Sequence, residues 1–175
     1  MNLTGKELRA MNIITNVSDE CVQMHGIDLE LVKVESMHGV GQISKYWKTR
    51  LVKYSEVAKS LILVGNKGAD KPIEAAGWQL NPGVYNVTFK QGCKIPSNQM
   101  LLIRQRSSLL RNGGSLHSSV FDAGFETDAI GTVMTIHHPI EIEEGARIAQ
   151  IYAHKWNEVE NLYTGQFQKD LQRKG

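Results

Sequence analysis

The alternation of apolar and polar positions along the chain is mostly that of short strands. Residues 83–89, GVYNVTF, alternate after an Asn-Pro-Gly turn sequence, and residues 130–136, IGTVMTI, are rich in β-branched side chains. Both features are typical of strands. Further short apolar segments, each next to a turn signal, lie at 93–95, 100–103, 140–142 and 147–152. Short strands at this spacing predict an all-β sandwich or barrel.

Little of the pattern indicates helix. Ser18 is placed to cap a short helical turn through Asp19 and Glu20, which Gly26 would end. Residues 45–60, KYWKTRLVKYSEVAKS, fit helix and strand equally well, and we interpret them as an insertion or an edge feature. The fold is therefore expected to contain one or two short helices.

Length and composition are those of one domain that buries its own core. The chain has 175 residues, with 41% hydrophobic and 22% charged. A formal charge of +2 is too small to indicate general nucleic-acid binding. The longest apolar run, Leu61–Val64, reads as a strand or short buried segment and falls far short of the roughly 20 residues of a membrane helix. The first residues lack the pattern of a secretory signal. We expect a cytoplasmic protein that binds neither membranes nor nucleic acid.

The two cysteines indicate neither a disulfide framework nor a metal site. Cys21 and Cys93 lie far apart in sequence and match no metal-ligand spacing. In a cytoplasmic protein such cysteines are expected to be reduced and buried.

Candidate chemistry begins at residues 104–114, RQRSSLLRNGG. Arginine suits bidentate phosphate contacts and serine adds short donors, yet this segment alone is better read as a solvated turn. Asp122 alters that interpretation, because it stands alone in the largely apolar segment SSVFDAGF, 118–125. Such a carboxylate either forms a turn or acts as a base on a water, with arginines or a metal drawing charge from the phosphates.

Five segments, in this order, resemble the dUTPase and dCTP deaminase superfamily, on the deaminase-like branch that includes bifunctional enzymes and phage or archaeal dUTPases. Turns at 80–83, LNPG, and 95–96, IP, are also similar to that family, and the resemblance spans residues 26–168. The five segments are HGIDLEL (25–31), RSSLLR (106–111) with Gly113, VFDAGF (120–125), GARIAQ (145–150) and YTGQFQ (163–168).

The resemblance implies an architecture and a substrate class. The fold would be an all-β, dUTPase-like jelly roll or β-clip barrel that assembles as a homotrimer with active sites between subunits. The substrate would be a deoxynucleoside triphosphate, dUTP, held with Mg²⁺. Residues 1–157 would form one β domain, in which 33–71 are a possible elaboration, and 158–175 would form a C-terminal arm that closes over the nucleotide.

The resemblance also implies roles for the phosphate-binding and catalytic residues. Arg106 and Ser107 would grip phosphates, with Ser108 and Arg111 nearby. Asp122 would be the general base, orienting or deprotonating the water that attacks the α-phosphorus. Hydrolysis of a triphosphate needs this combination of charge neutralisation and one positioned water.

The remaining implied roles concern the sugar, the base and the metal. Phe125 would lie against the deoxyribose and leave no room for a 2′-hydroxyl. Gln150 would lie near the base or the phosphates, and the arm from Tyr163 to Gln168 would cover the nucleotide. Asp28 would support the metal indirectly, through its water shell.

One missing residue type separates hydrolysis from deamination. Deaminases of this kind need a glutamate about ten residues after the Asp122 position, to move protons at the cytosine ring. Residues 130–136 contain no ionisable group, and Glu126 and Asp128 come too early and are expected on the preceding turn. The sequence thus predicts Mg²⁺-dependent hydrolysis of dUTP to dUMP and pyrophosphate. The alternatives are a dCTP deaminase or bifunctional deaminase and dUTPase, and a non-catalytic, nucleotide-binding regulatory trimer.

Overall fold

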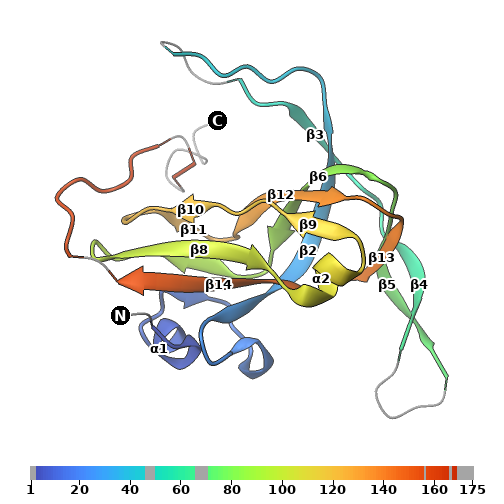
Figure 1. Cartoon of the computed structure of the whole chain (residues 1–175), viewed down its shortest axis with the longest axis horizontal. Coiled ribbons are helices and arrows are strands. Elements are labelled where there is room, and N and C mark those ends of the chain that lie inside the picture. The colour runs from blue at the N-terminus through green and yellow to red at the C-terminus, as the bar shows by residue number, and fades with distance from the viewer. Residues whose placement is uncertain (1–2, 46–49, 66–70, 156, 166, 169–175) are drawn as a thin grey trace.

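A computed structural model describes residues 3–45, 50–65, 71–155, 157–165 and 167–168, and it is mostly β (Figure 1). The helical elements are short: α1 (Gly5–Ala10), the 3₁₀ turn η1 (Asp19–Cys21) and α2 (Ser107–Arg111). The longer strands are β2 (Ile27–His38), β5 (Ile73–Leu80), β6 (Gly83–Phe89), β8 (Gln99–Gln105), β12 (Gly131–Ile136) and β14 (Arg147–Lys155). The shorter strands are β1 (Ile14–Thr15), β3 (Lys53–Glu56), β4 (Ser60–Val64), β7 (Gly92–Lys94), β9 (Gly114–Leu116), β10 (Val120–Phe121), β11 (Glu126–Thr127) and β13 (Ile140–Glu143).

One curled antiparallel sheet organises the molecule. Its strand order is β10-β8-β14-β2-β6-β12-β9, with β3 paired to the far end of β2. Two smaller sheets, β1-β7-β11 and β13-β5-β4, lie beside it. Figure 1 shows the β2–β3 ribbon rising from one end of the body and the β4–β5 hairpin projecting from another. The all-β fold that the sequence predicts is confirmed.

The core fills the inside of this curled sheet. Its side chains alternate along β2, β6, β8, β12 and β14, as expected where one face of each strand is buried. The largest fully buried side chains are Trp78, Phe89, Leu8, Ile13, Ile14, Ile27, Leu29, Leu31, Leu101, Ile103, Ile130 and Met134. None of the described helices is long and apolar enough to cross a membrane.

The strand predictions and the expectation of one or two short helices are confirmed, while the predicted capping role of Ser18 is wrong. Strand β6 has the predicted bounds, and a 3₁₀ turn does follow Ser18. The Ser18 hydroxyl, however, makes no capping bond to the backbone and instead donates to the Cys21 Sγ at 3.2 Å. Helix α1 was not predicted, although Thr4 and Glu7 form a reciprocal capping box that is readable as the sequence TGKE.

The region that fitted helix and strand equally well is extended where the structure describes it. Strand β3 lies within it, and residues 46–49 are outside the described residues. Of the two alternatives for residues 61–64, a strand or a short buried segment, the strand is confirmed as β4; Ile62 is 3% exposed, whereas Leu61 and Leu63 are 66% and 64% exposed. The cause is position, because β4 is the edge strand of the projecting hairpin.

Candidate functional site

Arg106 is fixed at the start of α2 by the neighbouring strand β14. Its backbone N–H donates to the Ile148 carbonyl at 2.9 Å, and its guanidinium Nη1 donates to the Arg147 carbonyl at 3.0 Å. Its own backbone is extended, as is usual for the residue that precedes a helix. The first bond fixes the backbone of Arg106 beside β14, and the second holds its partly exposed guanidinium near the sheet.

The other predicted phosphate-binding residues follow Arg106 on α2. Ser107, Ser108 and Arg111 are all exposed, while Leu109 packs the helix onto the core. The structure therefore brings the four predicted phosphate-binding residues together, on one short helix and the residue before it.

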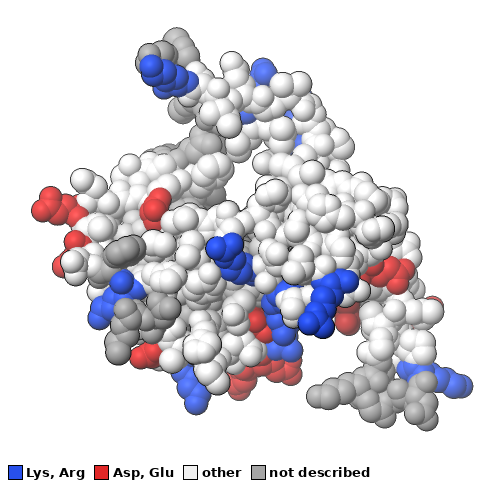
Figure 2. All heavy atoms as spheres, viewed as in Figure 1, with Lys and Arg blue, Asp and Glu red and all other residues white. Residues whose placement is uncertain are grey.

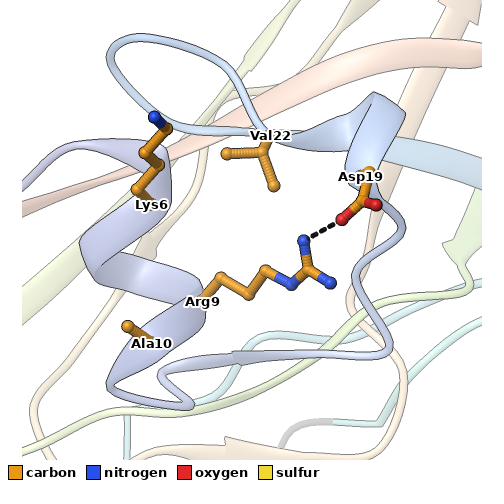
Figure 3. Close-up of a pocket in the computed structure, with 5 residues that line it drawn as sticks. All are labelled: Lys6, Arg9, Ala10, Asp19 and Val22. Carbon is orange, nitrogen blue, oxygen red and sulfur yellow. Dashed lines mark hydrogen bonds and ion pairs between the residues drawn. The ribbon is translucent and has the colours of Figure 1, made fainter.

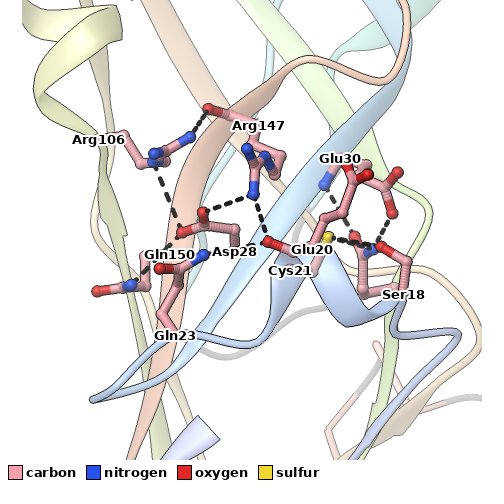
Figure 4. Close-up of polar contacts among 10 residues, drawn as sticks. Ser18, Glu20, Cys21, Gln23, Asp28, Glu30, Arg106, Arg147 and Gln150 are labelled. Carbon is pink, nitrogen blue, oxygen red and sulfur yellow. Dashed lines mark hydrogen bonds and ion pairs between the residues drawn. The ribbon is translucent and has the colours of Figure 1, made fainter.

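Asp28 lies beneath this group, buried between two arginines (Figure 4). The residue is 1% exposed; its Oδ1 is 3.6 Å from Arg106 Nε, and its Oδ2 is 3.7 Å from an Nη of Arg147. Gln150, its register partner on β14, donates to Oδ1 at 3.4 Å. Burial raises the pKa of Asp28 above its usual value, against the opposing effect of the two guanidinium groups and the amide. The cluster ties Arg106, Asp28 and Gln150 into one polar unit.

This cluster restricts how Asp28 can meet a metal ion. Two guanidinium cations already flank the carboxylate, so direct coordination of a divalent cation does not fit. Its Oδ2 is buried, is ion-paired with Arg147 at 3.7 Å and makes no hydrogen bond to any described residue, so one of its acceptor positions is unsatisfied. Within the described residues, no group of three or more His, Cys, Asp or Glu side chains could hold a metal. An indirect role of Asp28 at a metal, through water, therefore stays a prediction.

Asp122 lies at the opposite end of strand β8 from Arg106. It is exposed, directly after β10, where Phe121 pairs with Leu101 of β8. Continuing this register places Asp122 beside Met100, and Arg106 is six residues further along, about 20 Å at the rise of an extended strand. Within one chain the predicted base and the predicted phosphate-binding residues therefore do not meet.

A cavity of about 510 Å³ lies beside Asp122. The cavity is lined by residues of the turn after β10, of strands β6 and β12, of the C-terminal arm and of the β2–β3 ribbon. The residues that line it are Leu51, Tyr54, Asn86, His117, Ser119, Val120, Phe121, Asp122, Phe125, Thr127, Ala129, Gly131, Thr132, Val133, Tyr163 and Phe167. Three predicted site residues, Asp122, Phe125 and Tyr163, thus share one cavity.

The described part of the C-terminal arm lies against its own chain, on the turn after Asp122. The Tyr163 backbone N–H donates to the Ala123 carbonyl at 2.8 Å. The Gln168 amide donates to the Gly124 carbonyl at 2.7 Å and accepts from the Glu126 backbone N–H at 2.9 Å. The arm therefore packs against the body, and Gln168 acts here on backbone groups.

The cavity contains no carboxylic acid on β12. The lining residues from that strand are Gly131, Thr132 and Val133, and the Thr132 hydroxyl donates to the His117 carbonyl at 2.8 Å. Glu126, expected on a turn, lies instead on β11, with its carboxylate 3.7 Å from the Lys94 ammonium. The described cavity thus lacks the glutamate that deamination would need.

Sequence reasoning missed two kinds of site residue. Arg147 belongs to the GARIAQ segment, so its position near the site could be predicted from the sequence. Its contact with Asp28 could not, because that contact depends on the pairing of β14 with β2. Leu51 and Tyr54 reach the cavity from the ribbon, and Asn86 reaches it from β6. No motif marks these three residues, since their positions follow from the tertiary arrangement.

Other surface features carry less chemistry. A hollow of about 620 Å³ lies between α1 and η1, and Arg9, which lines it, is already paired with Asp19 (Figure 3). On the face seen in Figure 2, Lys and Arg occur in separate small groups with acids between them, rather than as one basic surface. The residues that line the hollow in Figure 3 include none of the predicted catalytic or substrate-binding residues.

The model of the dCTP deaminase-like family matches residues 3–155. The deoxyuridine 5′-triphosphate nucleotidohydrolase of Methanocaldococcus jannaschii is 35% identical over 155 residues, which are 88% of this chain and 91% of that protein. A probable deoxyuridine 5′-triphosphate nucleotidohydrolase of Halobacterium salinarum is 32% identical over 154 residues, 88% of this chain and 87% of that protein.

A solved structure shares the fold. The 2′-deoxycytidine 5′-triphosphate deaminase from Agrobacterium tumefaciens superposes with a TM-score of 0.63 at 16% identity, over 88% of this chain. The match covers 47% of the deaminase chain, so this chain spans about half the length of that protein. At this identity the likeness concerns the fold alone.

Proposed function

We propose that this chain, which belongs to the dCTP deaminase-like family, hydrolyses dUTP to dUMP and pyrophosphate. The observation that carries the proposal is the cavity in which Asp122, Phe125 and Tyr163 meet while the lining part of β12 offers no acid. A carboxylate beside a nucleotide-sized cavity suits hydrolysis, and the missing acid disfavours deamination. The nucleotidohydrolase names of relatives at 32% and 35% identity support the same choice.

In this reaction the chemistry occurs at the α-phosphorus. Asp122 takes a proton from a water, the water oxygen bonds to the α-phosphorus, and the bond to the bridging oxygen of the β-phosphate breaks. dUMP and pyrophosphate are the products. Phe125 would face the deoxyribose, and Tyr163 and Gln168 would keep the arm over the nucleotide. Positioning and exclusion of water are what these residues contribute.

The phosphates would be bound by another copy of the chain. Arg106 and Asp122 lie about 20 Å apart along β8, too far for both to contact one α-phosphate. A homotrimer in which Arg106, Ser107, Ser108 and Arg111 of one copy approach the Asp122 cavity of the next would complete the site. Closed rings of this kind are a usual form of homo-oligomer.

Mg²⁺ would be held mainly by the triphosphate itself. Asp28 would assist through a coordinated water, with Gln150 beside it, because the buried Oδ2 has no described hydrogen-bond partner. When bound, Mg²⁺ supplies charge neutralisation on the phosphate oxygens. We place the enzyme in the cytoplasm, where its nucleotide substrate is found.

The test is pyrophosphate release from dUTP, dCTP, dTTP and UTP, measured for the wild type and for Asp122→Asn. We expect release from dUTP that falls by about 10²–10⁴-fold in Asp122→Asn. Loss of the cytosine absorbance with dCTP would show the deaminase instead. Binding of dUTP without turnover by the wild type would show a non-catalytic, regulatory protein.

A further inference from the structure

A cluster of polar side chains crosses β2 and β6 beside the cavity. Lys33 Nζ lies 2.6 Å from Glu35 Oε1, and the Asn86 side-chain NH₂ donates to Glu35 Oε2 at 2.8 Å. Glu35 pairs with Asn86 across β2 and β6, and Asn86 pairs with Val133 across β6 and β12. Residues opposite each other in a sheet share a face, so Asn86 and Val133 lie on the face that lines the cavity.

Glu35 determines which end of the Asn86 amide is available to a ligand. Burial alone would raise the pKa of Glu35, but the bonds from Lys33 and Asn86 hold it below its usual value. The ionised carboxylate has only acceptors, so the Asn86 NH₂ must face it. The amide orientation therefore follows from chemistry, and the Asn86 Oδ1 acceptor is the polar atom left for a ligand.

We propose that Asn86 selects the base at the proposed dUTPase site, by accepting a hydrogen bond from the N3–H of uracil, and that Glu35 and Lys33 are positioning residues for its amide. This proposal rests on the proposed function for its substrate. Uracil and thymine carry a hydrogen on N3, whereas cytosine presents a lone pair there. Cytosine would place two acceptors against each other, and an unpaired buried acceptor is costly.

A glutamate paired with a side-chain amide also occurs on two other strands, away from the cavity beside Asp122. The Gln79 amide donates to Glu141 at 2.8 Å across β5 and β13, and neither residue lines the cavity beside Asp122. This second glutamate and amide pair is a matched control, because it has the same chemistry at a remote place.

The experiment compares Glu35→Gln with Glu141→Gln. A glutamine at position 35 can donate as well as accept, so the Asn86 amide is free to turn. The measurement is calorimetric affinity for non-hydrolysable α,β-imido analogues of dUTP, dTTP and dCTP. We expect the wild type to bind the dUTP and dTTP analogues more tightly than the dCTP analogue. We expect Glu35→Gln to reduce both preferences by roughly tenfold and Glu141→Gln to leave them unchanged.

A second variant covers the chance that Glu35→Gln disturbs the sheet. Asn86→Leu removes the acceptor with little change of volume, and should weaken the dUTP and dTTP analogues while sparing the dCTP analogue. The proposal is overturned if the wild type shows no preference for N3–H bases, if both glutamine variants shift the ratio equally, or if Asn86→Leu weakens all three analogues alike. The analogues report binding alone. If the protein failed to turn over dUTP, the proposed function would be overturned, but the binding preferences would still test the role of Asn86.

Discussion

Tyr163 of the C-terminal arm lies edge-on against Phe125, with ring centroids 5.3 Å apart and ring planes at 86°. This contact joins the arm to the turn that carries Asp122, and it forms part of the cavity wall. Edge-to-face pairs of this kind contribute about 0.5–1.5 kcal/mol beyond the area they bury. The arm is therefore held in place by a ring contact at the proposed sugar position.

Loss of the Tyr163 ring should weaken substrate binding more than it slows chemistry. We expect Tyr163→Ala to raise KM for dUTP by about tenfold, because arm closure would lose the ring contact. The conservative Tyr163→Phe keeps the ring and should stay close to the wild type. Steady-state kinetics of the three proteins gives the comparison. A fall of kcat at unchanged KM in Tyr163→Ala would contradict this role.

Two inactive variants should restore activity when they assemble together. Asp122→Asn and Arg106→Ala damage different halves of a site that we place between copies. Among all trimers that assemble at random from equal amounts of both chains, roughly one quarter of the sites would combine an intact Asp122 with an intact Arg106. We expect pyrophosphate release at about that fraction of the wild-type rate after the two are unfolded and refolded together.

The control for this mixing experiment is each variant refolded alone, which should remain inactive. Size-exclusion chromatography with light scattering gives the number of copies in each sample. Should the refolded mixture stay as inactive as its components while forming trimers, Arg106 and Asp122 would not act at a shared site.

Replacement of Phe125 should relax discrimination against ribose. If its ring occupies the space of a 2′-hydroxyl, Phe125→Leu opens that space, and the kcat/KM ratio of dUTP to UTP should fall by about tenfold. Phe121→Leu is the matched control, since its ring lies 5.6 Å from that of Phe125 and lines the same cavity. Equal changes in both variants would assign the effect to general loosening of the cavity.

The strands were predictable because their signal is local. Alternation in residues 83–89 and the β-branched run of β12 each specify a strand without reference to the rest of the chain. The exposure of Leu61 and Leu63 was not predictable, because it depends on β4 being an edge strand. Helix α1 could have been predicted from its capping box, which is a local signal. Features that depend on contacts between distant residues could not be predicted from the sequence alone.

Some residues of the candidate site could likewise be predicted from the sequence, and others could not. Asp122 and Phe125 stand in a short segment that resembles the family, and the structure places them in one cavity. Asn86 is 51 positions from Glu35, and their contact exists only through the pairing of β6 with β2. Likewise, Arg147 reaches Asp28 through the pairing of β14 with β2. Register is a property of the folded sheet, so these partners were beyond sequence reasoning.

Cys93 should make the stability of the protein fall at alkaline pH. The residue is 1% exposed on β7, and burial raises the pKa of its thiol from about 9 to about 12. Above pH 9 the unfolded chain loses this proton while the folded chain keeps it, so the free energy of unfolding falls as pH rises toward 12. Below pH 9 both states hold the proton, and Cys93 contributes no pH dependence.

The slope attributable to Cys93 is up to about 1.4 kcal/mol per pH unit. Urea unfolding of the wild type and Cys93→Ala at steps from pH 8 to pH 11 measures it. Cys21, whose pKa burial also raises, is present in both proteins, so the difference between the two curves isolates Cys93. We expect Cys93→Ala to be less stable at pH 8, because it leaves a small cavity, and this deficit to shrink above pH 9. Curves that stay parallel up to pH 11 would show that the folded thiol ionises as readily as the unfolded one.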